Sequence, residues 1–266
     1  FAQEYISNHT GDYLGQTPPK DSAIIFAPGI ISVTNRGEYA ISISPNHDEY
    51  FYNAGMSVDT TQPYGLLHIK RVGDKWLKPQ QANLNQKGFW EQEAFFSSKG
   101  NEIYYAVSEL VSDTVYTKIW VSHKTKNGWG KGELLNSPIN ESAKRVFYAT
   151  LSKNGNLYYT NVDKVKIHIS ENNNGKYDNI QEIGLPRAGH AYIAPDEDFI
   201  IFDSRQTDNF GKTDIYIAFK TVDGNWSEPI NLGPQVNTEY LETCPSLSPD
   251  GKYIFFGRYN DKNEKS

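Results

Sequence analysis

A short pattern recurs five times along this chain: an apolar strand, a turn rich in Pro, Asp, Asn and Gly, and a second strand that ends in paired aromatic or aliphatic residues. The copies occupy residues 41–53, 94–107, 149–162, 191–204 and 245–258. Five residues align and define the reference position of the repeat: Ser44, Ser97, Ser152, Ala194 and Ser248. The steps between them are 53, 55, 42 and 54 residues (97−44, 152−97, 194−152, 248−194). A repeat of roughly 40–50 residues made of short strands is typical of a β-propeller.

Two further strand-like runs follow each complete hairpin. The third-strand candidates are residues 65–70, 118–123, 164–170 and 214–219. The fourth-strand candidates follow a Gly, Asn or Asp turn and begin at an aromatic residue: Trp76, Trp129, Tyr177 and Trp226. Because four antiparallel strands make one propeller blade, we expect an all-β propeller of five four-stranded blades.

The repeat covers most of the 266 residues, which favours one domain. We expect an extended lead-in over 1–22 and a single propeller over 23–266, with little or no helix. The run 23–32 stands before the first repeat where a fourth strand would stand, yet no hairpin precedes it. We therefore expect it to complete the last blade, which would protect an exposed sheet edge, and a further strand to follow Ser266 in the natural protein.

Three segments resemble the WD-like propeller repeats of the TolB type: SPDGKYIFF at 248–256, DIYIA at 214–218 and WSEPINLG at 226–233. The resemblance extends over about residues 23–260. It implies a β-propeller and an exported bacterial protein, in a group that includes binding modules and sugar-related enzymes. The third and fourth copies depart from the repeat, with SKNG and APDE in place of SPDG. Their Asn, Asp and Gly residues still suit the turn.

Composition excludes some partners and indicates a compartment. The formal charge is −6, from 26 basic and 32 acidic residues, which argues against nucleic acid as a partner. No apolar stretch approaches the roughly 20 residues that a membrane-spanning helix needs. Phe1, Ala2 and Gln3 look like the remnant of a cleaved signal peptide, so we expect a periplasmic or secreted protein. The alternative is that the sequence simply starts there.

Equivalent repeat positions should form a ring at one mouth of the central channel. Six residues before the reference position stand Glu38, Glu91 and Glu242, and the two blades without a Glu carry Arg145 and Arg187 one residue earlier. Carboxylates and guanidiniums on one rim suit a polar ligand, since both make charge-assisted hydrogen bonds. The alternative is structural: each Glu bonds backbone groups of a neighbouring blade, and each Arg pairs with a Glu.

Three more candidates occupy the position four residues before the reference. Glu93, Tyr148 and His190 stand there, and we expect Arg205, beside the polar hairpin of residues 208–214, to reach the same rim. Cys244 holds this position in the last copy, and as the only cysteine next to a proline it is interpreted as a small buried hydrophobic residue. The histidines are dispersed and no paired metal-ligand motif occurs, so we expect neither a metal site nor a cofactor.

The sequence therefore predicts a binding module that recognises a glycan fragment or a protein segment at the channel mouth. Two alternatives stay open. The first is a carbohydrate-active enzyme, either a glycoside hydrolase with paired rim carboxylates or a lyase in which His190 or Tyr148 moves a proton and Arg187 neutralises an acidic sugar. The second is a scaffold for protein–protein interaction. No catalytic motif supports the enzyme, because a fold does not by itself carry a function.

Overall fold

The computed structural model describes residues 4–55, 63–85 and 90–259. Within these residues the elements are strands and two short 3-10 helices, η1 (Asp12–Gly15) and η2 (Pro138–Glu141), so the all-β prediction is confirmed. No described helix has the length and apolar content that crossing a bilayer requires. The signal-peptide interpretation of residues 1–3 and the strand expected after Ser266 both lie outside the described residues.

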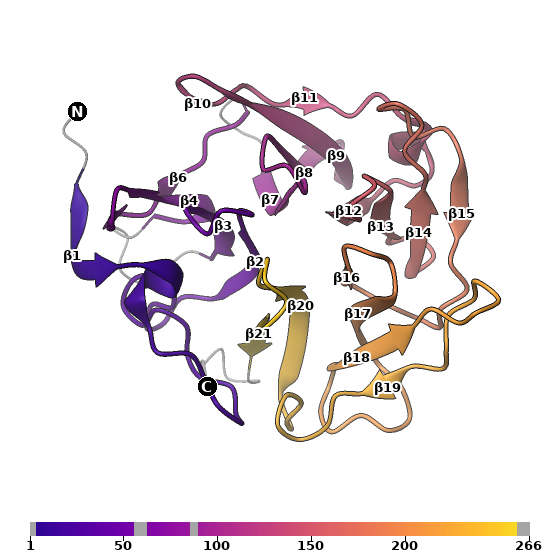
Figure 1. Cartoon of the computed structure of the whole chain (residues 1–266). Coiled ribbons are helices and arrows are strands. Elements are labelled where there is room, and N and C mark those ends of the chain that lie inside the picture. The colour runs from indigo at the N-terminus through magenta and orange to yellow at the C-terminus, as the bar shows by residue number, and fades with distance from the viewer. Residues whose placement is uncertain (1–3, 56–62, 86–89, 260–266) are drawn as a thin grey trace.

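Five antiparallel sheets stand side by side around a centre, which is the arrangement of a β-propeller (Figure 1). Sheet 1 contains β1 (Tyr5–Thr10), β2 (Glu38–Ile43), β3 (Glu49–Ala54), β4 (Gly65–Val72), β5 (Lys75–Leu77) and β6 (Gln80–Gln81). Sheet 2 contains β7 (Trp90–Phe96), β8 (Glu102–Val111), β9 (Thr114–Thr125), β10 (Gly128–Trp129) and β11 (Glu133–Leu134). Within the described ranges, four of the five sheets have four or more strands.

The remaining sheets are smaller. Sheet 3 contains β12 (Val146–Leu151), β13 (Leu157–Asn161), β14 (Lys166–Ser170) and β15 (Ile180–Glu182). Sheet 4 contains β16 (Ala191–Ile193), β17 (Phe199–Ser204), β18 (Asp214–Phe219) and β19 (Ile230–Asn231). Sheet 5 is the hairpin of β20 (Leu241–Leu247) and β21 (Ile254–Tyr259). Each predicted hairpin therefore forms two paired strands of one sheet, and each predicted third strand forms the next strand of the same sheet.

The N-terminal region departs from the prediction in two ways. The lead-in supplies β1, which pairs with β5 and widens sheet 1. The run 23–32, expected to be the outer strand of the last blade, forms no strand. Its backbone groups are used locally, because Ile30 and Ile31 donate to the Ala27 carbonyl and Gly29 donates to the Ser32 carbonyl. A backbone bonded to itself in a turn has no free row of groups to pair with a sheet edge.

Side chains join this N-terminal region to sheet 5 instead of a strand pairing. The ring of Phe26 packs edge-on against Phe255 with centroids 5.0 Å apart, and Tyr13 packs against Tyr253 at 5.4 Å. Among the described residues sheet 5 has two strands, so the prediction of a fifth four-stranded blade closed by residues 23–32 is not met there.

The strands β2, β7, β12, β16 and β20, one from each sheet, face the centre. β2 contacts β7 and β20, and β7 contacts β12, which contacts β16, which contacts β20, so the five inner strands close a ring. Apolar side chains fill the space between neighbouring sheets: Leu66 of sheet 1 clusters with Ile103 of sheet 2, for example. We call the face on which the inner strands begin the rim face. Because neighbouring strands are antiparallel, second strands end and third strands begin on it.

Candidate functional site

A β-bulge recurs at one point of four inner strands. Ala40, Glu93, Tyr148 and Cys244 have left-handed backbone with φ of 52°, 59°, 51° and 53°. The pairing of each inner strand with its second strand shifts register at this point. A bulge with a left-handed residue redirects a side chain, and ordinary residues adopt this conformation rarely. All four stand four residues before the reference position of their copy. In the remaining copy His190 stands at this place.

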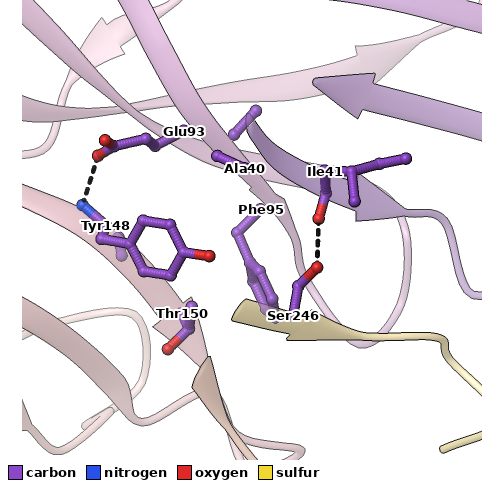
Figure 2. Close-up of a pocket in the computed structure, with 9 residues that line it drawn as sticks. Ala40, Ile41, Glu93, Phe95, Tyr148, Thr150 and Ser246 are labelled. Carbon is purple, nitrogen blue, oxygen red and sulfur yellow. Dashed lines mark hydrogen bonds between the residues drawn. The ribbon is translucent and has the colours of Figure 1, made fainter. Parts of the chain in front are cut away.

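The redirected side chains fill the middle of the ring. Ala40, Tyr148 and Cys244 come from sheets 1, 3 and 5 and form one buried contact cluster. Figure 2 shows Glu93 and Tyr148 next to each other among the residues that line a cavity of about 10 Å³. That space suits about one water molecule and is far below the roughly 300 Å³ of an ordinary small-molecule site. A cavity of this size does not admit a sugar.

Side chains of one sheet hold the bulge of the next. Asn53, at the end of β3, accepts a 2.6 Å hydrogen bond from the Glu93 backbone N–H and donates a 3.1 Å bond to the Glu91 carbonyl. In the same way, Oε2 of Glu93 accepts a 3.1 Å bond from the Tyr148 backbone N–H (Figure 2). Buried backbone donors need such partners, so these bonds fix the spacing of neighbouring sheets.

Asp203 does the same between sheets 4 and 5 and carries a charge as well. Its Oδ2 accepts the Cys244 backbone N–H at 3.1 Å and the Thr243 hydroxyl. Its Oδ1 accepts the His190 backbone N–H at 3.1 Å, while Oδ2 lies 2.6 Å from Nδ1 of the His190 ring. The carboxylate is therefore surrounded by donors, one of them an imidazole whose proton it fixes on Nδ1.

The other ring nitrogen of His190 points to Glu93. Nε2 lies 3.6 Å from Oε1 of that residue, and the Tyr148 ring packs edge-on against the imidazole at a centroid distance of 4.9 Å. Glu93 is 7% exposed and Cys244 is 3% exposed. Ligand atoms of Glu93, His190 and Cys244 lie within 4.8 Å of one another. An oxygen, a nitrogen and a sulfur from three sheets thus meet at the centre of the ring.

The charges of this group are coupled. Burial raises the pKa of the Asp203 carboxyl, but the His190 imidazole and the donated hydrogen bonds outweigh it and hold the pKa below its usual range. Burial opposes a charged His190, yet the Cys244 sulfur and the Asp203 carboxylate bring its pKa well above the ordinary value. Burial also raises the pKa of the Cys244 thiol. A buried thiol with a raised pKa is a poor nucleophile, because the thiolate is the reactive form.

A second cavity of about 70 Å³ borders Cys244 and Tyr39 and reaches Phe26 and Phe255. It lies where the N-terminal region covers the junction of sheets 1 and 5. Its size admits water or an ion rather than a drug-sized ligand.

The three rim glutamates hold loops on the chain itself. Glu38 accepts the Arg36 guanidinium at 2.6 Å, and Glu242 accepts Arg258 at 2.8 Å. Glu91 accepts the backbone N–H of Asn85, and its burial raises the pKa of its carboxyl. The predicted ring of Glu and Arg thus forms differently: two glutamates pair with arginines that the sequence did not single out.

The predicted arginines lie on the rim face with exposed side chains. Arg145 directly precedes β12, and Arg187 lies in the loop before β16. Within the described residues, neither guanidinium forms a hydrogen bond or an ion pair with a side chain or carbonyl of the chain. Arg205 follows β17 on the same face and donates a 3.4 Å bond to the hydroxyl of Thr213.

The structure therefore divides the nine predicted residues into three groups. Glu93, Tyr148 and His190 come together at the centre, the glutamates fasten loops, and the arginines stay on the rim. Asp203 and Cys244 join the central group although the sequence did not select them. A signal for Asp203 existed: Asn53, Asn161 and Asp203 each stand nine residues after the reference position (53−44, 161−152, 203−194).

Comparison with solved structures shows the fold alone. No protein-family model matches the chain, and no curated protein sequence does. TolB from Acinetobacter baumannii is 14% identical with a TM-score of 0.52, over 82% of this chain and 47% of that one. The Bacillus subtilis arabinanase Arb43A is 11% identical with a TM-score of 0.51, over 88% of this chain and 93% of that one. This chain thus spans about half of the TolB chain that it matches.

Proposed function

We propose that this chain is a binding protein that docks an acidic, partly apolar segment of a protein partner on its rim face. The observation that carries this proposal is an apolar hairpin tip on that face. β8 and β9 are the longest described strands, and they pair up to Val111 and Thr114. Ser112 and Asp113 form the turn with φ of 46° and 64°, the left-handed pair of a tight hairpin turn.

The tip of this hairpin exposes apolar surface. Leu110 is 68% exposed, and Val111 and Val115 are also exposed beside it. Trp90, at the start of β7, is 62% exposed and pairs across the sheet with Ser108. An apolar group that stays in water on a projecting element favours burial against a partner, because burying it removes apolar area from water.

The arginines on the rim face favour a partner with negative charge. Arg145 forms a β-bridge with Thr117 of the same hairpin, which brings it to the base of the apolar tip. A guanidinium without a partner binds a carboxylate through two parallel hydrogen bonds. Arg187 precedes the inner strand of the next sheet on the same face. Trp and Arg are the residue types that contribute most to protein interfaces, so an acidic and apolar segment suits this surface.

The same geometry gives less support to a carbohydrate-active enzyme. A glycosidase needs two carboxyl groups facing an open pocket. Glu38 and Glu242 are instead bonded to Arg36 and Arg258, and the cavity beside Glu93 measures about 10 Å³. An acidic glycan fragment bound by Arg145 and Arg187 is the remaining form of the sequence prediction, and the experiment below distinguishes it. We further propose an exported protein of the TolB type with β20–β21 as the inner half of a fifth blade.

Site-specific photocrosslinking tests the docking surface. A photoreactive residue at Leu110 should capture a partner protein in the cells that make this chain, and the double variant Arg145→Ala/Arg187→Ala should reduce the yield at least about tenfold. The matched control is Val222, an exposed apolar residue in the turn after β18. That turn lies on the opposite face, because β18 begins on the rim face.

Equal capture from Leu110 and Val222 would contradict the proposal. A parallel thermal-shift screen with acidic and neutral oligosaccharides gives the other reading, since a ligand that binds only the folded state raises its melting temperature. An arginine-dependent shift with an acidic sugar, together with no capture at Leu110, would replace the protein partner with a glycan.

A further inference from the structure

The central group of Glu93, His190 and Cys244 has the donor atoms of a metal site. We propose that these three residues bind a single Zn²⁺ ion at the centre of the ring, between sheets 2, 4 and 5. Their oxygen, nitrogen and sulfur atoms all lie within 4.8 Å of one another. Nothing in the docking proposal depends on this site, so each stands or fails by itself.

The separation of two donors fits one shared ion. Nε2 of His190 and Oε1 of Glu93 are 3.6 Å apart, which is longer than a good hydrogen bond. Zinc binds nitrogen and oxygen ligands at about 2.0–2.2 Å in tetrahedral geometry, which places two such ligands roughly 3.3–3.5 Å from each other. Small side-chain adjustments therefore bring both atoms into the first coordination sphere.

The surroundings orient the imidazole for this role. Asp203 lies 2.6 Å from Nδ1 and holds a proton there, so an ion that binds at Nε2, on the side of Glu93, displaces only the Nε2 proton of the imidazolium. The backbone N–H of Cys244 and the Thr243 hydroxyl hold the Asp203 carboxylate in turn. A carboxylate on the far nitrogen of a ligating histidine is the usual outer partner in zinc sites, because it sets ring orientation and basicity.

The balance of charge at the centre also favours a cation. Glu93 and Asp203 are both buried, and each forms its ion pair with His190. In the described part of the chain no Lys or Arg pairs with either carboxylate. Two buried carboxylates that share one imidazole leave negative charge without compensation, which is costly in a poorly solvated interior. A divalent ion supplies the missing positive charge.

The donor set and the space select the class of ligand. Thiolate and imidazole prefer zinc, whereas calcium and magnesium take oxygen ligands. The cavities beside Glu93 and Cys244 measure about 10 and 70 Å³, so they admit an ion and water but no organic ligand of ordinary size. The larger cavity borders Cys244.

Metal titration of the tag-free protein tests the site. After treatment with a chelator, the protein should take up one equivalent of Zn²⁺ in competition with a chromophoric chelator. Co²⁺ in place of Zn²⁺ should give intense tetrahedral absorption and a thiolate-to-cobalt charge-transfer band. Cys244 is the only cysteine, so such a band can come from no other residue of the chain.

Variants identify the ligands. Cys244→Ser, His190→Gln and Glu93→Gln should each weaken Zn²⁺ binding more than about tenfold, and Asp203→Asn should weaken it about 10–100-fold through the imidazole. The matched control is His123→Gln, since His123 forms a histidine–carboxylate pair with Glu102 on the exposed surface. Its binding should stay within about twofold of the wild type.

Two results would overturn the proposal. The first is a wild-type protein that takes up no stoichiometric Zn²⁺ or gives a cobalt spectrum without the charge-transfer band. The second is a His123→Gln variant that loses as much affinity as His190→Gln. Only proteins that unfold cooperatively in the absence of metal are compared, which shows that each of them is folded. Where a variant does not fold, the cobalt spectrum of the wild-type protein still tests the proposal.

Discussion

At two junctions of the ring, different side chains accept the backbone N–H of the bulge residue in the next sheet. Between sheets 1 and 2, the amide of Asn53 accepts the Glu93 backbone N–H and donates to the Glu91 carbonyl. Between sheets 4 and 5, the carboxylate of Asp203 accepts the Cys244 backbone N–H. Both residues stand nine positions after the reference residue of their repeat. The backbone requirement is the same, yet only the second junction carries a charge.

The comparison of Asn53 with Asp203 shows that the fold requires a hydrogen-bond acceptor at this position but does not require a charge. A neutral amide is sufficient to bond the bulge of the next sheet, as Asn53 demonstrates. The charge of Asp203 adds a 2.6 Å contact with His190, and that imidazole reaches Glu93 of sheet 2. Buried ionisable groups cost free energy beyond any structural requirement, so the carboxylate of Asp203, where an amide is sufficient, indicates a chemical role.

Removal of the two acceptor side chains, Asp203 and Asn53, should lower the free energy of unfolding by different amounts. Asp203→Ala should lower the free energy of unfolding by about 3–5 kcal/mol, because buried donors and the imidazole lose their acceptor together. Asn53→Ala should cost about 1–3 kcal/mol, the usual range for unpaired buried polar groups. Urea unfolding with a chelator present measures both values without a contribution from metal. Equal losses would mean that the charge contributes nothing to the second junction.

The half-buried imidazole of His68, in sheet 1, should make the stability of the chain sensitive to acid. Burial lowers the pKa of His68, on β4, from 6.5 to about 4. Its ring stacks on Phe51, and Nε2 has no hydrogen-bond partner in the described chain. The unfolded chain therefore gains a proton near pH 6.5 while the folded chain resists it until about pH 4. Stability from this residue is complete above pH 6.5 and falls by about 2–3 kcal/mol as the pH drops to 4.

The variant His68→Gln isolates this effect. The difference in unfolding free energy between wild type and variant should change between pH 6.5 and 4 and stay constant above pH 7. His123→Gln serves as the control, because His123 is exposed and pairs with Glu102. A flat difference across the window would show that His68 protonates as easily in the folded chain as in the unfolded one.

The sequence predicted the repeated elements because each copy contains its own signals. Alternating apolar residues and Asn, Asp and Gly turns specify a hairpin locally, so the hairpins and third strands lie where expected. The run 23–32 misled the prediction because apolar content alone does not separate a strand from a turn that packs on a core. Pro28 and Gly29 interrupt it, and its backbone bonds close on themselves.

Part of the central group could be predicted from the sequence. Glu93, Tyr148 and His190 share one repeat position, and they do contact one another, but at the centre of the ring and not at the channel mouth where they were expected. Cys244 shares that position too, but a lone buried cysteine is usually a small apolar residue, and only the ring closure places it beside His190. The bonds of Glu38 and Glu242 to Arg36 and Arg258 depend on loop paths that no repeat position encodes.

An exchange at the first junction sharpens the comparison. Asn53→Asp replaces the amide donor that bonds the Glu91 carbonyl with a carboxylate oxygen, so two acceptors would face each other. We expect a loss of about 1–3 kcal/mol at pH 7, the usual cost of an unsatisfied buried group. Protonation of the new carboxyl restores a donor, so the loss should shrink below about pH 5. Urea unfolding at pH 7 and pH 4.5 checks both parts, and a loss that grows in acid would contradict them.

The smallest effect is expected at the rim, where arginines of two kinds can be compared. Arg145→Ala and Arg187→Ala should each change the free energy of unfolding by less than about 0.5 kcal/mol, because their exposed guanidiniums have no partner in the described chain. Arg258→Ala is the reference, since Arg258 lies 2.8 Å from a fully buried Glu242 carboxylate whose charge would lose its partner. Thermal and urea unfolding of the three variants make the comparison. A large loss at Arg145 or Arg187 would mean that these residues hold sheets together, and that would remove the free cations on which the proposed docking of an acidic segment depends.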